Sequence, residues 1–250
     1  MATPPTALVT NDDGIDSPGL HRLAAAALEA GMNVIVAAPA EEASGSSASI
    51  AVQQTDGRIL FERRELAGLE ESTAYAVEAG PGLIALLAAH GTFGTVPDVL
   101  LSGINRGENI GQVVLHSGTV GAALTAGANG IRAMALSHAV PRDGGEPGWT
   151  HAAGIARDLL PRLLEQPAGT VLSVNVPVTT GEDVDVRPAT LAQFGVVQMT
   201  ATEADEDSED SVRLAVSDPT DTPAPGSDAA LLAEGFATLT ALRSIAEDPS

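Results

Sequence analysis

Short apolar runs alternate with helical patterns along most of this chain, and this alternation limits its fold more than any other feature. Residues 7–9, 34–36 and 99–101 are apolar without interruption, which is typical of strands that are buried on both faces. Between the first two runs, apolar residues recur from 20 to 28 at the spacing of one helix face. Alternating strands and helices predict an α/β fold with a doubly wound, mostly parallel sheet.

The remaining elements are predicted from the same periodicities. Strands are expected at 58–64 and 73–77, outside the parallel core, and at 133–137, and helices from Pro81 and over 119–128. A helix is predicted over 149–165, and Pro161 is expected to kink or split it. Residues 170–176 are predicted to form the last strand of the main sheet.

The character of the chain changes after Pro177. Six of the eight residues from Glu203 to Asp210 are acidic, and the stretch from 218 to 228 is rich in Pro, Asp and Thr. Such segments are usually solvated loops, and short strand-like runs at 213–216 and 236–239 lie around them. We therefore predict a core over residues 1–177 and, over 178–250, an extended C-terminal arm with β-hairpins.

The charge of the chain limits its partners. The formal net charge is −21, and all 12 basic residues are arginines. A surface of this kind repels polyanions, so binding of a nucleic-acid polymer is not expected. The chain has no cysteine, which excludes disulfides and thiolate metal sites, and no apolar run long enough for a membrane span. We expect a cytoplasmic protein without a membrane partner.

Two adjacent carboxylates follow the first predicted strand, in the sequence Asn11-Asp12-Asp13-Gly14. The carboxyl ends of parallel strands are where open α/β sheets bind ligands. Adjacent like charges raise the free energy unless a positive charge lies between them, and a divalent cation would supply it. The same four residues are also good turn formers, so a purely structural turn is the alternative.

A glycine-rich loop follows the strand at 98–102 and is expected at the same edge of the sheet. It contains Asn105, whose amide could bind a metal or a phosphate, but it matches neither a Walker loop nor a dinucleotide fingerprint. A tight structural connection is the alternative. The serine-rich loop at 44–49 indicates by composition only a flexible loop.

The segment His116-Ser117-Gly118-Thr119 precedes a predicted helix. Backbone N–H groups and hydroxyls at a helix start can bind phosphate, although the same residues also make an ordinary N-cap. His116 could donate a proton to a leaving alkoxide, or be a structural histidine. Carboxylate and amide oxygens favour Mg²⁺ or Mn²⁺, so the three segments together indicate phosphate-ester hydrolysis.

These motifs resemble the SurE (survival protein E) family in order and spacing, over roughly residues 6–180. The resemblance implies a Rossmann-like fold and a 5′/3′-nucleotidase that uses one divalent metal per subunit and acts on a small nucleotide or phosphomonoester. It further implies a C-terminal arm exchanged between subunits in a homodimer or homotetramer. The implied metal ligands are Asp12, Asp13, Ser44 and Asn105, with Asp12 and Asp13 catalytic. Substrate contacts are implied for Asn11, Asn109, His116, Ser117, Gly118 and Thr119.

One segment departs from that family. Where the family usually has Thr-Pro-Ala-Asp-Cys at the start of a helix, this chain has Gly80-Pro81-Gly82-Leu83-Ile84. This change is the basis of the alternative function, a non-catalytic nucleotide- or metabolite-binding protein on the same fold. Haloacid-dehalogenase-type phosphatases are set aside, because they need Asp-x-Asp and a lysine that this chain lacks.

Overall fold

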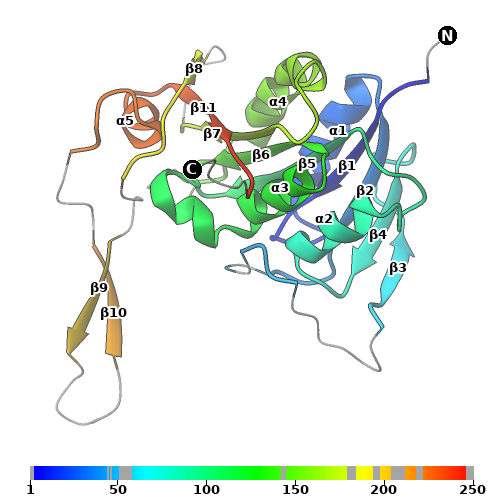
Figure 1. Ribbon diagram of the computed structural model, residues 1–250, viewed down its shortest axis with the longest axis horizontal. Coiled ribbons are helices and arrows are strands. Elements are labelled where there is room, and N and C mark those ends of the chain that lie inside the picture. Colours follow the sequence, from blue (N-terminus) through cyan, green and yellow to red (C-terminus); the bar gives the residue numbers. More distant parts are fainter. Residues whose placement is uncertain are drawn as a thin grey trace, which may run out of the picture.

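A computed structural model describes residues 3–43, 45, 47–50, 58–141, 145–178, 184–193, 198–203, 212–217 and 222–245. Nine of the described strands form one sheet in the order β3-β4-β2-β1-β5-β6-β7-β11-β8 (Figure 1). The six strands from β4 to β7 are all parallel to one another. The predicted α/β fold with a doubly wound, mostly parallel sheet is confirmed.

The elements of the sheet and its helical layers have the following bounds. The strands are β1 (Thr6–Thr10), β2 (Asn33–Pro39), β3 (Phe61–Arg64), β4 (Thr73–Val77), β5 (Val99–Arg106), β6 (Arg132–His138), β7 (Val171–Val176), β8 (Val186–Pro188) and β11 (Ala237–Leu242). The helices are α1 (Pro18–Glu29), α2 (Pro81–Ala89), the short 3₁₀ helix η1 (Gly111–His116), α3 (Gly118–Ala128), α4 (Trp149–Leu164) and α5 (Asp228–Ala233).

Helices cover the sheet in two layers, which explains why its central strands are apolar on both faces. α1 packs with α4 over one face, and α2 packs with α3 over the other (Figure 1). Leu8 and Val9 of β1 are completely buried and belong to the two different cores. Burying both faces of a strand in this way is what an uninterrupted apolar run requires.

Three sequence predictions about these elements are wrong. β4 belongs to the parallel sheet, because its alternate residues Ala74 and Ala76 are buried against the core beside β2; β3 is the antiparallel edge. Pro161 does not split α4, because it lies in the last turn, where its missing N–H removes one bond of the ladder while Leu160 and Leu163 stay buried. The other expectation, a kink at Pro161, stays a prediction.

The third error concerns the end of the sheet. β7 is not its last strand, because β11 pairs with β7 in antiparallel and β8 pairs with β11. Thr238 and Leu239 of β11 are buried, which places this strand in the packed body of the protein. The division of the chain at residue 177 stays a prediction.

A two-stranded hairpin of β9 (Gln198–Glu203) and β10 (Val212–Ser217) stands away from the main sheet (Figure 1). Its strands pair in antiparallel over six residues each. This is the extended C-terminal β-hairpin that the sequence predicts. Among the described helices, none combines the length and the apolar character needed to cross a membrane.

Candidate active site at the carboxyl edge of the sheet

The candidate site lies where the chain changes direction across the sheet. β1 and β5 are neighbours, with Thr10 opposite Ser102, while β2 lies on the other side of β1. The connections that follow β1 and β5 therefore diverge, and open α/β sheets bind ligands in the crevice at such a point. Asp12 and Asp13 follow β1, as the sequence predicts. Asn105 lies near the end of β5, which continues to Arg106, so the prediction of a loop from residue 102 onward is wrong.

Asp12 is held by the start of α3. It is only 6% exposed, and Thr119 Oγ1 donates to its Oδ1 at 2.6 Å. Burial raises the pKa of Asp12 above its usual value, and hydrogen bonds from the Thr119 hydroxyl and backbone oppose that rise. The Thr119 hydroxyl therefore positions a carboxylate, and Thr119 is not among the residues that line the cavity described below.

Asp13 is half-buried beside Asp12, and its pKa is raised from 3.8 to about 6. Burial is the main cause, followed by the negative charges of Asp12 and Glu42. A hydrogen bond from the backbone N–H of Arg106, together with the positive charge of that residue, lowers the pKa in part. The site thus concentrates negative charge that the described protein groups compensate incompletely.

Asn11 stabilises the turn that contains these aspartates. Asn11 is completely buried, and its Nδ2 donates to the carbonyl of Gly14 at 3.1 Å and to Ser17 Oγ at 2.6 Å. Gly14 has a φ of +98°, a conformation that favours glycine. Asn11 does not reach the wall of the cavity, so its predicted contact with substrate stays a prediction.

The end of β5 and the loop after it are fixed by two asparagines. Asn105 Nδ2 donates to the carbonyl of Gly107 at 2.7 Å, which leaves the amide oxygen of Asn105 as its group for a ligand. Asn109 is clamped by Asn175 of β7, which accepts from its backbone N–H at 2.8 Å and donates to its carbonyl at 3.0 Å. Asn109 Nδ2 also donates to Ser137 Oγ at 2.8 Å. Asn175 and Ser137 were not predicted as contributors.

A cavity of about 410 Å³ opens between these loops and the start of α3. Most of the predicted site residues line it, together with four that were not predicted to contribute. The lining comprises Asp12, Asp13, Glu42, Gly45, Asn105, Arg106, Asn109, Val113, His116, Ser117 and Gly118. His116 is exposed, and Ser117 caps α3 by accepting from the N–H of Val120 at 3.1 Å. Ser44 lies outside the described residues.

The donor set of this cavity fits a hard divalent cation. Two neighbouring carboxylates with raised pKa values and an amide oxygen supply the oxygen ligands that Mg²⁺ and Mn²⁺ prefer. Within the described ranges, no group of three or more His, Cys, Asp or Glu side chains is arranged to hold a metal. A complete ligand set therefore depends on neutral oxygens, of which Asn105 is described.

Arg106 and Glu42 are the charged residues of the cavity that sequence reasoning missed. Arg106 is the last residue of β5, in the segment predicted to be a glycine-rich loop, and it is the one arginine among the residues that line the cavity in the described part of the chain. Its place in a segment expected to bind a metal or a phosphate, in a chain with few cations, was the available signal. Glu42 gave no signal, because acidic residues are common in this sequence.

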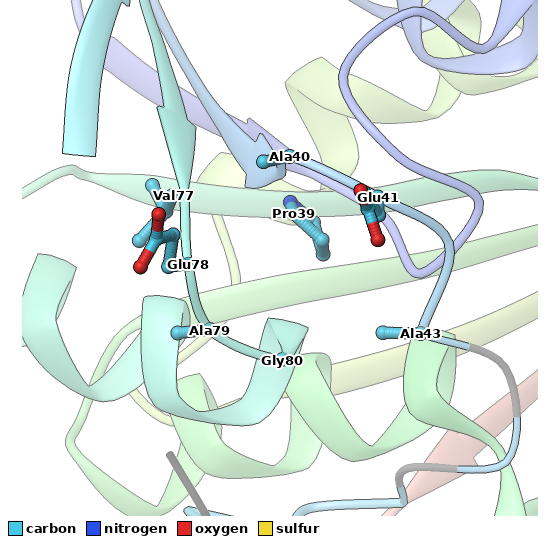
Figure 2. A pocket seen from close by; sticks show the side chains of 8 residues that line it. All are labelled: Pro39, Ala40, Glu41, Ala43, Val77, Glu78, Ala79 and Gly80. Atoms are coloured by element: carbon cyan, nitrogen blue, oxygen red, sulfur yellow. The ribbon is translucent and has the colours of Figure 1, made fainter. Parts of the chain in front are cut away.

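A second cavity of about 400 Å³ lies beside the first, at the carboxyl ends of β2 and β4 (Figure 2). The two cavities share the loop from Pro39 to Gly45, and the N–H of Ala43 donates to the carbonyl of Asp12 at 2.7 Å. Glu41 and Glu78 extend from opposite walls of this cavity (Figure 2). Gly80, where the chain departs from the family pattern, is one of the residues that line it.

Known proteins resemble this chain in sequence and in structure. Residues 7–204 match the family described as survival protein SurE. The protein named 5′-nucleotidase SurE 1 from Burkholderia lata is 36% identical over 194 residues, which cover 76% of this chain and 71% of that protein. The 5′-nucleotidase SurE from Desulforudis audaxviator is 36% identical over 184 residues, covering 72% and 68%. The crystal structure of the SurE protein from Aquifex aeolicus superposes with a TM-score of 0.77 at 24% identity, over 98% of this chain and 95% of that chain.

Proposed function

The chain belongs to the SurE family, and from this premise we propose that it is a 5′-nucleotidase that hydrolyses nucleoside monophosphates to nucleoside and phosphate. The observation that carries the proposal is the adjacent pair Asp12 and Asp13 in a cavity that also contains Asn105 and the start of α3. This arrangement offers oxygen ligands for a cation on one side and N–H groups with hydroxyls for a phosphate on the other.

The proposed metal ligands are Asp12, Asp13 and Asn105, with Ser44 added on the family resemblance. A bound Mg²⁺ or Mn²⁺ would polarise the phosphoryl oxygens and lower the pKa of a water molecule. The side chains of the protein would position the ligands and the cavity wall. Thr119 keeps Asp12 in place through its 2.6 Å hydrogen bond, and Asn175 holds the backbone of Asn109 at the cavity wall.

Proton transfer is assigned to two residues that differ in exposure. Asp13 is half-buried at the cavity wall, where its carboxylate can orient an attacking water and accept its proton. His116 is an exposed residue of the same cavity lining, where its imidazole can donate a proton to the leaving alkoxide and recover one from solvent. The Ser117 hydroxyl and the Gly118 N–H lie on the side of the phosphate.

The second cavity offers room for the nucleoside. It adjoins the phosphate site through Ala43, and the carboxylates of Glu41 and Glu78 can accept hydrogen bonds from amino or hydroxyl groups (Figure 2). The β9–β10 hairpin is the segment we propose for assembly into a homodimer or homotetramer.

Phosphate release from a panel of 5′- and 3′-nucleoside monophosphates tests the proposal. Turnover is expected with added Mn²⁺ or Mg²⁺, and less than about 1% of it after metal removal with a chelator, because the carboxylate pair cannot bind an anionic phosphate without a cation between them. Turnover that survives the chelator would contradict the metal mechanism. Tight nucleotide binding in calorimetry without turnover for any metal would favour the non-catalytic binding protein instead.

Arg106→Gln is expected to raise KM for the nucleotide roughly five-fold with little change in kcat, since an exposed cation supplies modest attraction to an anion. Arg106 offsets part of the negative charge of Asp12, Asp13 and Glu42 in the cavity lining. The rise in KM should shrink at high ionic strength, where exposed charges are screened. Arg157→Gln on α4 is the matched control, because Arg157 pairs with Glu29 at 3.3 Å and does not line the cavity. Equal KM values for the two variants would exclude Arg106 from substrate binding.

A further inference from the structure

Asp228, at the start of α5, is a charged residue that the proposed chemistry does not use. Its exposure is 0%, yet no Lys or Arg of the described ranges forms a salt bridge with it. Its carboxylate is instead satisfied by three backbone N–H groups at 2.8 Å: Gly111 donates to Oδ2, while Ala192 and Ala229 donate to Oδ1. Burying a carboxylate is unfavourable unless such hydrogen bonds replace its water, so this arrangement needs all three partners.

The hydrogen bond from Gly111 connects Asp228 to the part of the candidate site that is proposed to bind phosphate. Gly111 is the first residue of η1, which runs to His116 and is followed directly by Ser117 and Gly118 at the start of α3. The first N–H groups of a helix have no partner within that helix, so the side chain of Asp228 satisfies a donor that η1 itself cannot. The position of Gly111 determines where η1 begins and therefore where His116 lies.

The same carboxylate also joins the two segments that flank the β9–β10 hairpin in the sequence. Ala192 precedes the hairpin and Asp228 follows it. The backbone strengthens this junction: the N–H of Asp228 donates to the carbonyl of Thr190 at 2.8 Å, and the N–H of Thr190 donates to that of Gly226 at 3.2 Å. One side chain thus connects both flanks of the hairpin with a loop of the site that lies 117 residues earlier in the chain.

We propose that Asp228 is a positioning residue for the phosphate side of the site: by holding Gly111, it fixes the start of η1 and links the base of the C-terminal arm to substrate binding. The expected effect of Asp228 on KM rests on the proposed nucleotidase function. The expected protection of the Gly111 amide from hydrogen exchange does not rest on that function.

Asp228→Asn in the full-length chain tests this link with almost no change of shape. The amide oxygen can still accept from Ala192 and Ala229, so the amide nitrogen is left facing the N–H of Gly111, where two donors meet. Hydrogen exchange of the Gly111 amide is expected to accelerate roughly ten-fold or more, the loss that follows from one charged hydrogen bond. KM for a nucleoside monophosphate should rise by a similar factor. The Mn²⁺ concentration for half-maximal activity should stay unchanged, because Asp12 and Asp13 lie in the turn after β1 and Asn105 lies in β5, apart from η1 and α5.

Ser227→Ala is the matched control. Ser227 caps α5 by accepting from the N–H of Ala230 at 3.3 Å, and it does not contact Gly111 through its side chain. This variant should loosen α5 without changing KM or exchange at η1. The proposal would be overturned if the Gly111 amide of Asp228→Asn exchanged at the wild-type rate. It would also be overturned if Ser227→Ala raised KM as much as Asp228→Asn does.

The wild-type protein supplies a further test that does not depend on how the variant folds. Its Gly111 amide should be protected from exchange, and an unprotected amide would contradict the assignment of Asp228. If the amide behaves as expected but the wild type releases no phosphate from any nucleotide, the positioning role stands and the nucleotidase function fails.

Discussion

Asp13→Asn is expected to lower phosphate release by roughly a thousand-fold, the change that corresponds to losing several kcal/mol of stabilisation from a metal-binding carboxylate. An asparagine keeps the size of the side chain but removes the charge that attracts a cation and the group that accepts a proton from water. Steady-state kinetics with a saturating nucleotide and titrated Mn²⁺ would measure the loss. Undiminished turnover would exclude Asp13 from the mechanism.

The same substitution should stabilise the metal-free protein at neutral pH. The pKa of Asp13 is about 6 in the folded protein, against 3.8 for an ordinary aspartate, so the folded state binds more protons than the unfolded state between these values. Stability therefore falls as pH rises through this window, and the penalty persists at neutral pH. Its removal should add about 1 kcal/mol to the free energy of unfolding, a figure reduced for solvent screening because the side chain is only partly buried.

Thermal unfolding in the presence of a chelator measures this gain. The difference between Asp13→Asn and wild type should vanish in acid below the pKa of an ordinary aspartate, where both states are protonated. Asp16→Asn is the control: Asp16 lies in the same turn, but its side chain is 72% exposed and forms a salt bridge with Arg64 at 3.6 Å. It should change neither turnover nor stability appreciably. A lower melting temperature for Asp13→Asn would contradict the proposed charge penalty.

Gly121→Ala is expected to lower activity about a hundred-fold. The added Cβ would overlap the backbone of the serine-rich loop, so the loop would have to shift. A Cβ at Gly121 would lie 2.5 Å from the carbonyl carbon of Ser47 and 2.6 Å from the nitrogen of Ala48. Ser47 also donates from Oγ to the carbonyl of Leu115 at 2.7 Å, which ties this loop to η1. Displacement of the loop would therefore disturb both the cavity wall at Gly45 and η1.

Gly154→Ala provides a matched substitution in another helix. No atom lies within 4 Å of a Cβ built at Gly154, and this residue lies in α4, away from the cavity lining. It should leave activity unchanged and raise stability by about 0.5–1 kcal/mol, the usual gain of Ala over Gly in a helix. Activity assays with circular dichroism on both variants distinguish loop displacement from a general effect of alanine. Full activity in Gly121→Ala would show that the loop does not contribute to the site.

Most residues of the cavity could be predicted from the sequence, because several of them lie at or after the ends of two strands that are recognisable from their apolar runs. Asp12, Asp13 and Asn105 were predicted to meet at one edge of the sheet, and they line one cavity. The roles of Asn175 and Asp228 could not be predicted, since each acts through a contact with a residue 66 or 117 positions away. Such contacts leave no periodicity in the sequence, and a motif that contains Asn175 does not show which residue it holds.

The sequence alone determined the fold class, the family and the position of the acidic pair. These depend on local properties: apolar runs that must be buried on both faces, helix spacing, and the turn chemistry of Asn-Asp-Asp-Gly. Only the tertiary structure decided that β4 joins the parallel sheet, that β11 and β8 extend it, and that Thr119 holds Asp12. The physical reason is that strand order and side-chain contacts are set by competition among distant segments for the same buried surface, and a sequence does not show which segment wins.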